Sequence, residues 1–152
     1  MRIIFILDNL YPNGRASSAR VREYGKGFVT NCIDTFVWMP APRQPFTYKG
    51  VLNPILKGTD DNGVKYEYIS GASKRHKNIL VRQLQDLYGY TSTLFKILTK
   101  CKKDDCVVIY EGCPMWHKMC LKVAHWAGAR CGIELNELPY GTGKETEITK
   151  AK

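Results

Sequence analysis

The sequence predicts an α/β fold, a Rossmann-like doubly wound parallel sheet of about five strands. Short apolar runs of strand type occur at residues 3–7, 35–39, 64–69, 106–110 and 132–135, and helical patterns lie between most of them. Alternation of strands and helices is typical of a parallel sheet that is covered on both faces. The chain has 152 residues, of which 44% are hydrophobic, which suits one domain with a sizeable core.

The first helix follows a polar turn after the first strand. It is expected to begin near Ser17 or Ser18, either of which can cap a helix, and to end near Asn31. Its apolar face carries residues at helical spacing, namely Val21, Tyr24, Phe28 and Val29.

A long loop is predicted after the second strand, over residues 40–62, because this segment is rich in proline and runs into the turn sequence "DDNG". A long helix is then expected over residues 74–99, which Gly89 would bend or split. Its apolar residues at helical spacing are Ile79, Leu80, Leu84, Leu87, Leu94 and Leu98. The next helix runs over residues 114–127, with Pro114 in its first turn and Gly128 as its stop.

The end of the sequence lacks a covering helix. After Gly143 the chain reads "KETEITKAK", whereas a doubly wound sheet needs a helix over its last strand. Residues 1–152 are therefore expected to form a single, incomplete amino-terminal domain of a larger protein.

Charge and cysteine usage limit the class of protein. Twenty-three Lys and Arg against fourteen Asp and Glu give a net charge of +9, which favours an anionic partner. The six cysteines form no CxxC pair, and Met1 leads into a strand and not into a signal sequence, so reduced, mostly buried thiols and a cytoplasmic location are expected. The longest apolar runs are too short to span a bilayer, so any membrane association would be peripheral, at the inner face.

Three polar loops follow strands and are the candidate binding sites, because ligands of open α/β sheets bind beyond the carboxyl ends of the strands. In the first, the helix amino terminus would hold a phosphate or carboxylate. Its residues are Asn13, Gly14, Arg15, Ser17 and Ser18. A capped turn without a ligand is the alternative. The dinucleotide fingerprint GxGxxG is absent, which disfavours NAD- or FAD-dependent oxidoreductases.

The second and third loops add carboxylates and an amide. Glu111 and Gly112 follow a buried strand, where Glu111 would either contact a ligand or favour the helix that starts at Pro114. The third loop carries Asn136, Glu137 and Tyr140, which could bind sugar hydroxyls or simply end a strand. The run "GTGKET" lacks the glycine spacing and the hydroxyl residue of a phosphate-binding P-loop, so an ATPase is rejected.

Two further groupings have structural alternatives. Cys113, His117 and Cys120 fall on one helical face, but their spacing does not match a zinc site, so a packed helix face is favoured and no metal is expected. Basic residues bracket the long helix at Lys74, Arg75, His76 and Lys77 and at Lys96, Lys100, Lys102 and Lys103. They indicate either a solvated face or, with neighbouring Leu, Tyr and Phe, contact with an anionic leaflet. No nucleic-acid-binding pattern is present.

The succession of these motifs resembles the amino-terminal part of a GT-B fold glycosyltransferase of the retaining, family 4 type. The resemblance rests on "YPNGRASSARV", "YGKGFVTNCIDTFVWMP", "VVIYEG" and "ELNELPYGTG", which occur in order over nearly the whole chain. It implies an acceptor-side Rossmann-like domain whose partner domain, absent from this sequence, holds most of a nucleotide-sugar donor. The Gly14 loop would approach the donor phosphate and sugar, and Glu111, Gly112, Asn136, Glu137 and Tyr140 would line the acceptor side.

The sequence departs from that family in two ways. Gly14 is followed by Arg15 where many members have a second glycine, and the donor-binding domain with its pair of glutamates is missing. The resemblance implies transfer of a sugar from a nucleotide-sugar to a glycan or lipid-linked acceptor in cell-surface polysaccharide or glycoconjugate synthesis, with no cofactor beyond the donor. Catalytic residues are not assigned, and the isolated chain is expected to be inactive.

Two other functions remain open at this stage. One is a stand-alone flavodoxin-like module that binds a phosphoanion without catalysis. The other is an interaction protein that pairs with a separate carboxy-terminal half.

Overall fold

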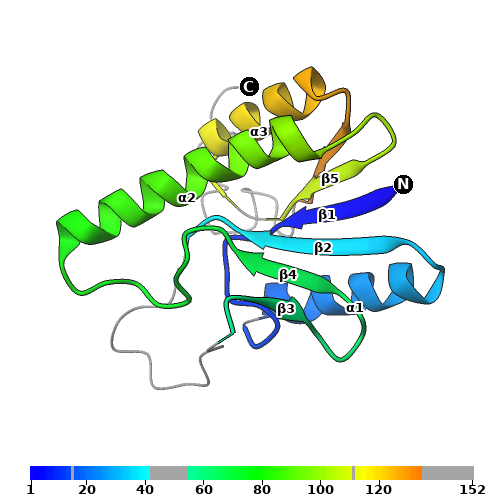
Figure 1. Ribbon diagram of the computed structural model, residues 1–152, viewed down its shortest axis with the longest axis horizontal. Helices are drawn as coiled ribbons and strands as arrows, with labels where there is room; N and C mark the ends of the chain where they lie inside the picture. The colour runs from blue at the N-terminus through cyan, green and yellow to red at the C-terminus, as the bar shows by residue number, and fades with distance from the viewer. Residues whose placement is uncertain (15, 42–54, 111, 135–152) are drawn as a thin grey trace, which may run out of the picture.

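The computed structural model describes residues 1–14, 16–41, 55–110 and 112–134. These residues form one six-stranded sheet with three helices (Figure 1). In chain order the elements are β1 (Arg2–Ile6), α1 (Ala16–Thr30), β2 (Asp34–Met39), β3 (Lys57–Thr59), β4 (Lys65–Tyr68), α2 (Ile79–Lys100), β5 (Cys106–Ile109), α3 (Pro114–Trp126) and β6 (Arg130–Ile133).

The strand order in the sheet is β3-β4-β2-β1-β5-β6. All neighbours are parallel except β3, which pairs antiparallel with β4 at one edge. The first strand therefore lies between the second and the fourth parallel strands, as in a Rossmann-like sheet, and not between the second and the third, as in a flavodoxin-like sheet. The Rossmann-like prediction is confirmed at this level, and the flavodoxin-like form of the alternative is wrong.

The five predicted strands are present as β1, β2, β4, β5 and β6, but β3 was not predicted and lies inside the expected loop 40–62. Its turn explains the difference. The Asp60 carboxylate accepts hydrogen bonds from the backbone N–H groups of Asn62 and Val64, both at 2.9 Å. This tight "DDNG" turn folds the three residues of β3 back onto β4, so that the sheet is mixed and has six strands.

The helices differ from their predicted bounds at their amino termini. α1 begins at Ala16, so Ser17 and Ser18 lie within its first turn and are not its caps. α2 begins at Ile79 and not near residue 74, because the Asn78 side chain caps it by accepting from the Leu80 N–H at 2.9 Å. α2 continues through Gly89 without a break, so the predicted split is wrong.

Two hydrophobic cores lie on opposite faces of the sheet. β1 contributes to both, because its alternate side chains point to opposite faces: Ile3 and Phe5 pack in the core under α1, and Ile4 and Ile6 pack in the core under α2 and α3. Figure 1 shows α2 and α3 together on one side of the sheet and α1 on the other. The sheet is therefore doubly wound, as predicted.

The apolar face of α2 that the sequence indicates does not pack on the sheet. Gly89, Thr93 and Ile97 are the buried positions of α2, whereas most of its leucines are exposed. Leu94 alone of the six predicted positions is partly buried against the core. In the ranges that the structure describes, no helix has both the length and the apolar character needed to cross a bilayer.

Candidate functional site

The topological switch point of the sheet lies between β1 and β5. The chain passes from β1 to β2 on one side, whereas β5, which follows later, pairs with the other side of β1. The loops after β1 and β5 therefore leave the sheet side by side, and the Tyr110 N–H, just past β5, donates to the Ile6 carbonyl at 2.9 Å. β6 adjoins β5, so the three predicted binding loops start at three neighbouring strands.

Several predicted site residues lie outside the residues that the structure describes. They are Arg15, Glu111, Asn136, Glu137 and Tyr140. Their roles stay predictions.

The first loop is held by its own hydrogen bonds. The Ser18 hydroxyl donates to the Leu10 carbonyl, and the Asn9 side-chain amide donates to the Ser17 hydroxyl at 3.0 Å. A Cβ atom at Gly14 would lie 2.1 Å from the Ser18 hydroxyl oxygen and 2.2 Å from the Leu10 carbonyl oxygen. Gly14, Ser17 and Ser18 thus allow the loop after β1 to pack closely against the first turn of α1. The groups that remain to bind a ligand here are the backbone N–H groups of that first turn.

Two tyrosines fix this loop to the far edge of the sheet. The Tyr68 hydroxyl accepts from the Tyr11 N–H at 3.1 Å and donates to the Tyr11 carbonyl at 2.9 Å. The Tyr11 hydroxyl donates to the Asp60 carboxylate at 2.6 Å. Burial raises the pKa of Tyr68 to about 12 and also raises the pKa of Tyr11, so both phenols are neutral donors at physiological pH. No sequence pattern indicated these long-range contacts.

Asn13 lines a pocket of about 280 Å³ next to the hydrogen bonds of Tyr11. The pocket also contains the carboxylates of Asp60 and Asp61 together with Arg22. Two carboxylates repel a phosphate but accept hydrogen bonds from hydroxyl groups. The side of the loop that carries Asn13 therefore suits a sugar hydroxyl better than the phosphate that the sequence suggested.

The second loop approaches α3 closely at Gly112. Its φ of +137° is in a region that favours glycine, and a Cβ atom there would lie 2.6 Å from Trp116 Cδ1 and 3.3 Å from His117 Nε2. Of the residues predicted to line the acceptor side, Gly112 is the one that lies within the described part of the chain. It brings the backbone after β5 against two polar side chains of α3.

Those side chains belong to a polar cluster at the switch point, formed by Asp8, Tyr90, Trp116 and His117. The Tyr90 hydroxyl donates to the Asp8 carboxylate at 2.7 Å, and the Tyr90 and Trp116 rings meet edge to face with centroids 4.6 Å apart. Trp116 Nε1 and His117 Nε2 are buried and have no hydrogen-bond partner among the described residues. Because buried polar groups are normally paired, these two nitrogens are the groups of the cluster that call for a hydrogen-bond partner beyond the described residues.

The grouping of Cys113, His117 and Cys120 does not act as one unit. Cys120 is fully buried in the core under α3, where burial raises its pKa, whereas Cys113 is exposed at the start of the helix. In the described part of the chain, no three His, Cys, Asp or Glu residues gather closely enough to hold a metal ion.

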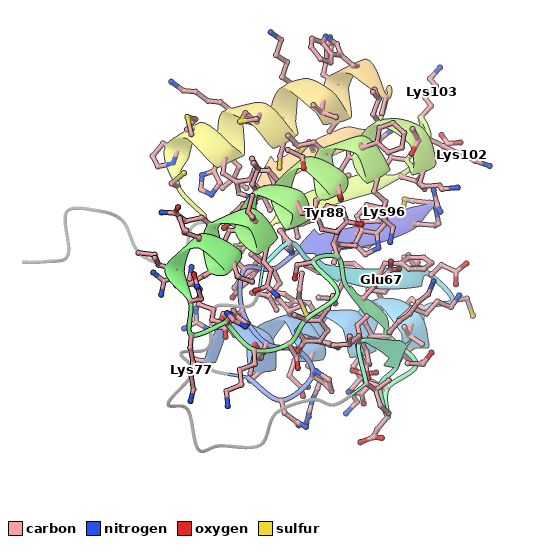
Figure 2. The ribbon with its side chains drawn as sticks, turned by 60° about the vertical axis from the view of Figure 1, so that its left-hand side comes forward. Glu67, Lys77, Tyr88, Lys96, Lys102 and Lys103 are labelled. Carbon is pink, nitrogen blue, oxygen red and sulfur yellow. The ribbon has the colours of Figure 1, made fainter. Side chains whose placement is uncertain are left out.

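A second hollow of about 620 Å³ lies on the sheet face beside α2, and the sequence did not indicate it. Its floor contains Phe36 and Trp38, and its cations are largely paired. Lys96 contacts the Glu67 carboxylate at 2.6 Å and lies 4.7 Å from the centroid of the Trp38 ring, and Lys65 contacts Asp34 at 2.9 Å. Figure 2 shows Lys96 beside Glu67. These ion pairs lie away from the switch point and stabilise the sheet near its edge. Because the charges are already paired with one another, we do not take this hollow as the candidate site.

The chain was also compared with known proteins. No family model, curated protein or solved structure matches it. The case for a function therefore rests on the geometry of the switch point and on the sequence motifs around it.

Proposed function

We propose that this chain is the acceptor-side domain of a glycosyltransferase that moves a sugar from a nucleotide-sugar to a glycan or lipid-linked acceptor. The observation that carries the proposal is the switch point between β1 and β5, because the two loops with the strongest sequence motifs leave the sheet there side by side. The reaction belongs to the complete enzyme, in which a second domain would hold most of the donor.

The groups at the switch point fit that role. The N–H groups of the first turn of α1 would stabilise the negative charge that develops on the departing diphosphate. Trp116 Nε1 and His117 Nε2 would bind sugar hydroxyls. Farther along the first loop, Asn13 would contact further hydroxyls together with Asp60 and Asp61 of the turn between β3 and β4. No nucleophile is assigned.

Amide NMR on the 152-residue chain tests the proposal. Titration with nucleotide-sugars is expected to shift the amide signals of Ser17, Ser18 and Gly112 and the indole signal of Trp116. Gly112→Val should raise the dissociation constant obtained from these shifts at least tenfold, because the valine side chain would fill the space against Trp116 and His117. The matched control is Lys57→Ala in the distant hollow, which should leave them unchanged.

The titration also separates this proposal from the phosphoanion-binding module. That alternative is favoured by one observation, the presence of a complete switch point and helix amino terminus within a single domain. Equal shifts with inorganic phosphate, nucleoside diphosphates and nucleotide-sugars would support the module. Shifts that need the sugar support the transferase. Because a second domain would hold most of the donor, the result that would contradict it is no response to nucleotide-sugars and none to glycan acceptors.

A further inference from the structure

The solvent face of α2 and α3 is unusually apolar. Leu84, Leu87 and Phe95 of α2 are 65%, 61% and 68% exposed, and Trp126 of α3 is 62% exposed. Together we call the exposed large apolar side chains of these helices the α2–α3 ridge; they are Ile79, Leu80, Val81, Leu84, Leu87, Tyr88, Phe95 and Leu98 on α2 and Met115, Met119 and Trp126 on α3. Many large apolar side chains exposed on two neighbouring helices usually mark an interaction site.

The ridge lies opposite the packed side of the helices. The buried positions of α2 are Gly89, Thr93 and Ile97, and at a helical period these point away from Leu84, Leu87 and Leu98. Between the two helices the ridge is hollowed by an apolar pocket of about 340 Å³, which is lined by Leu87, Leu94, Met115 and Met119 among others. Leu80, Leu84, Leu87 and Leu98 therefore face outward and are not the margin of the core, unlike Leu94, which is partly buried against it.

Positive charge flanks the ridge. Lys74 and Lys77 precede α2, and Lys102 and Lys103 follow it. Figure 2 shows Lys102 and Lys103 at the far end of the helix and Lys77 below its start. Lys118 and Lys122 stand among the exposed apolar residues of α3. The sole acidic residue within the two helices is Asp86, and Arg75 holds it at 2.8 Å. The ridge is thus apolar at its centre and cationic at its rim.

We propose that the α2–α3 ridge docks onto an anionic lipid surface, with α2 lying in the plane of the interface. A helix that presents Leu and Phe to the acyl boundary while lysines reach the headgroups binds anionic membranes in this way. Trp126 fits the headgroup level, because its ring is apolar, its N–H is polar, and the Lys122 ammonium lies 5.0 Å from the ring centroid. The inference concerns a surface distant from the sugar chemistry and does not depend on the proposed function.

A second copy of the chain is the main rival occupant. A symmetric dimer through α2 would bring the same surface of two molecules together, and therefore two cationic rims. Such like charges repel across an interface, whereas an anionic leaflet neutralises them. The charge pattern thus favours lipid over self-association.

Vesicle flotation tests the docking. The chain is expected to float with phosphatidylcholine vesicles that contain phosphatidylglycerol and not with vesicles of phosphatidylcholine alone. The double substitution Leu84→Ser and Leu87→Ser should reduce binding at least tenfold without lowering the thermal midpoint, because both side chains are exposed. Lys74→Gln with Lys77→Gln should reduce the binding to anionic vesicles and its sensitivity to salt.

Matched controls lie on the other side of the sheet. Tyr24→Ser and Lys26→Gln change an exposed aromatic residue and a lysine of α1, and they should leave flotation unchanged. A blue shift of tryptophan emission on anionic vesicles should disappear in Trp126→Phe, since Trp38 and Trp116 are buried. That variant should still float.

Three outcomes would overturn the proposal. The first is absence of binding to anionic vesicles, and the second is equal binding to neutral ones. The third is a dimer in vesicle-free sedimentation experiments that the Leu84→Ser, Leu87→Ser variant abolishes, which would assign the ridge to a second copy. None of these outcomes requires a sugar donor, so this test can fail while the proposed function stands, and the reverse.

Discussion

Asp105, just before β5, connects the start of that strand to the start of β1. Its carboxylate is buried and accepts hydrogen bonds from the Arg2 backbone N–H and Nε, both at 3.1 Å, and from the Lys102 N–H at 2.8 Å. Burial alone would raise its pKa, but the hydrogen bonds and charge of Arg2 outweigh burial and hold the pKa below the ordinary value of 3.8.

We expect Asp105→Asn to lower the free energy of unfolding at neutral pH by about 2 kcal/mol. Because the folded-state pKa is lowered, the contribution is complete above the unfolded-state value and is lost as the pH falls from about 4 through the folded-state pKa. Urea unfolding at a series of pH values should therefore show the parent and variant converging in acid. Asp61→Asn, which changes an exposed carboxylate, is the control, and a constant gap down to the lowest pH would contradict the account.

At the same scale, the sequence could predict part of the candidate site. It placed Gly14, Ser17 and Ser18 at the start of α1, but their contacts turned out to be with Asn9 and Leu10 of the same loop. The polar cluster at the switch point was not predicted, because Tyr90 and Asp8 are 82 positions apart and no local pattern pairs them. The position of Asp8 directly after a buried strand was the one signal that could have drawn attention to it.

At the scale of the elements, α2 rests on the loop after β2 through Gly89. A Cβ atom at this position would lie 1.7 Å from the Pro40 carbonyl oxygen. The glycine that the sequence suggested as a bend or break therefore permits close contact between an uninterrupted helix and a neighbouring loop.

Gly89→Ala is expected to lower the free energy of unfolding by about 1–3 kcal/mol, because the helix must move away from Pro40. Gly27→Ala in α1 is the matched control, since a methyl group there would meet no described atom within 4 Å beyond its own stretch of helix. That change should raise the free energy of unfolding by about 0.5–1 kcal/mol through helix propensity alone. Thermal and urea unfolding of both variants measure the difference, and equal effects would show that Gly89 has no packing role.

Local sequence signals predicted where the helices and strands lie better than they predicted which of their side chains are buried. Periodicity located α2, and its leucines suggested an apolar face. The face that meets the sheet is instead the one with the buried residues Gly89, Thr93 and Ile97, of which Ile97 belongs to the same core as residues of β1 and α3. β3 escaped prediction because three residues are too short to show a period, and its pairing depends on the Asp60 turn.

For the whole molecule, alternation and the right-handed crossover rule predict a doubly wound parallel sheet but not the order of its strands, because the Rossmann-like and flavodoxin-like orders both obey them. The pairing of β1 with β5 decides between the two orders, and it joins segments about a hundred residues apart that no local pattern connects. The burial of individual thiols was not predictable from the sequence either. Cys101 and Cys120 are buried in the core under α2 and α3, whereas Cys32 and Cys113 are exposed, so the expectation of mostly buried cysteines holds for part of the set.

Thiol labelling of the native chain reports on this arrangement. Cys32 and Cys113 should react rapidly with a disulfide reagent at about pH 8, and Cys101 and Cys120 should react only after unfolding. Burial raises the pKa of Cys101 and Cys131 to about 11, which keeps little reactive thiolate even if reagent reaches them. Mass spectrometry of the labelled peptides identifies the sites, and rapid labelling of Cys120 would mean that the core under α3 opens readily.

The central position of β1 in the sheet affects how the protein folds while the ribosome is still synthesising it. Its partner β2 is synthesised soon afterwards, but Arg2 and Asp105 are separated by 103 positions, so β5 emerges much later. We expect residues 3–68, which include β1, α1, β2 and β4, to collapse first, since they contain every buried residue of the core under α1 except Tyr110. Until β5 and α3 have been translated, Ile4, Ile6 and Trp38 remain uncovered on the other face of the nascent sheet, and it is during this interval that the chain is most exposed to aggregation and most dependent on chaperones.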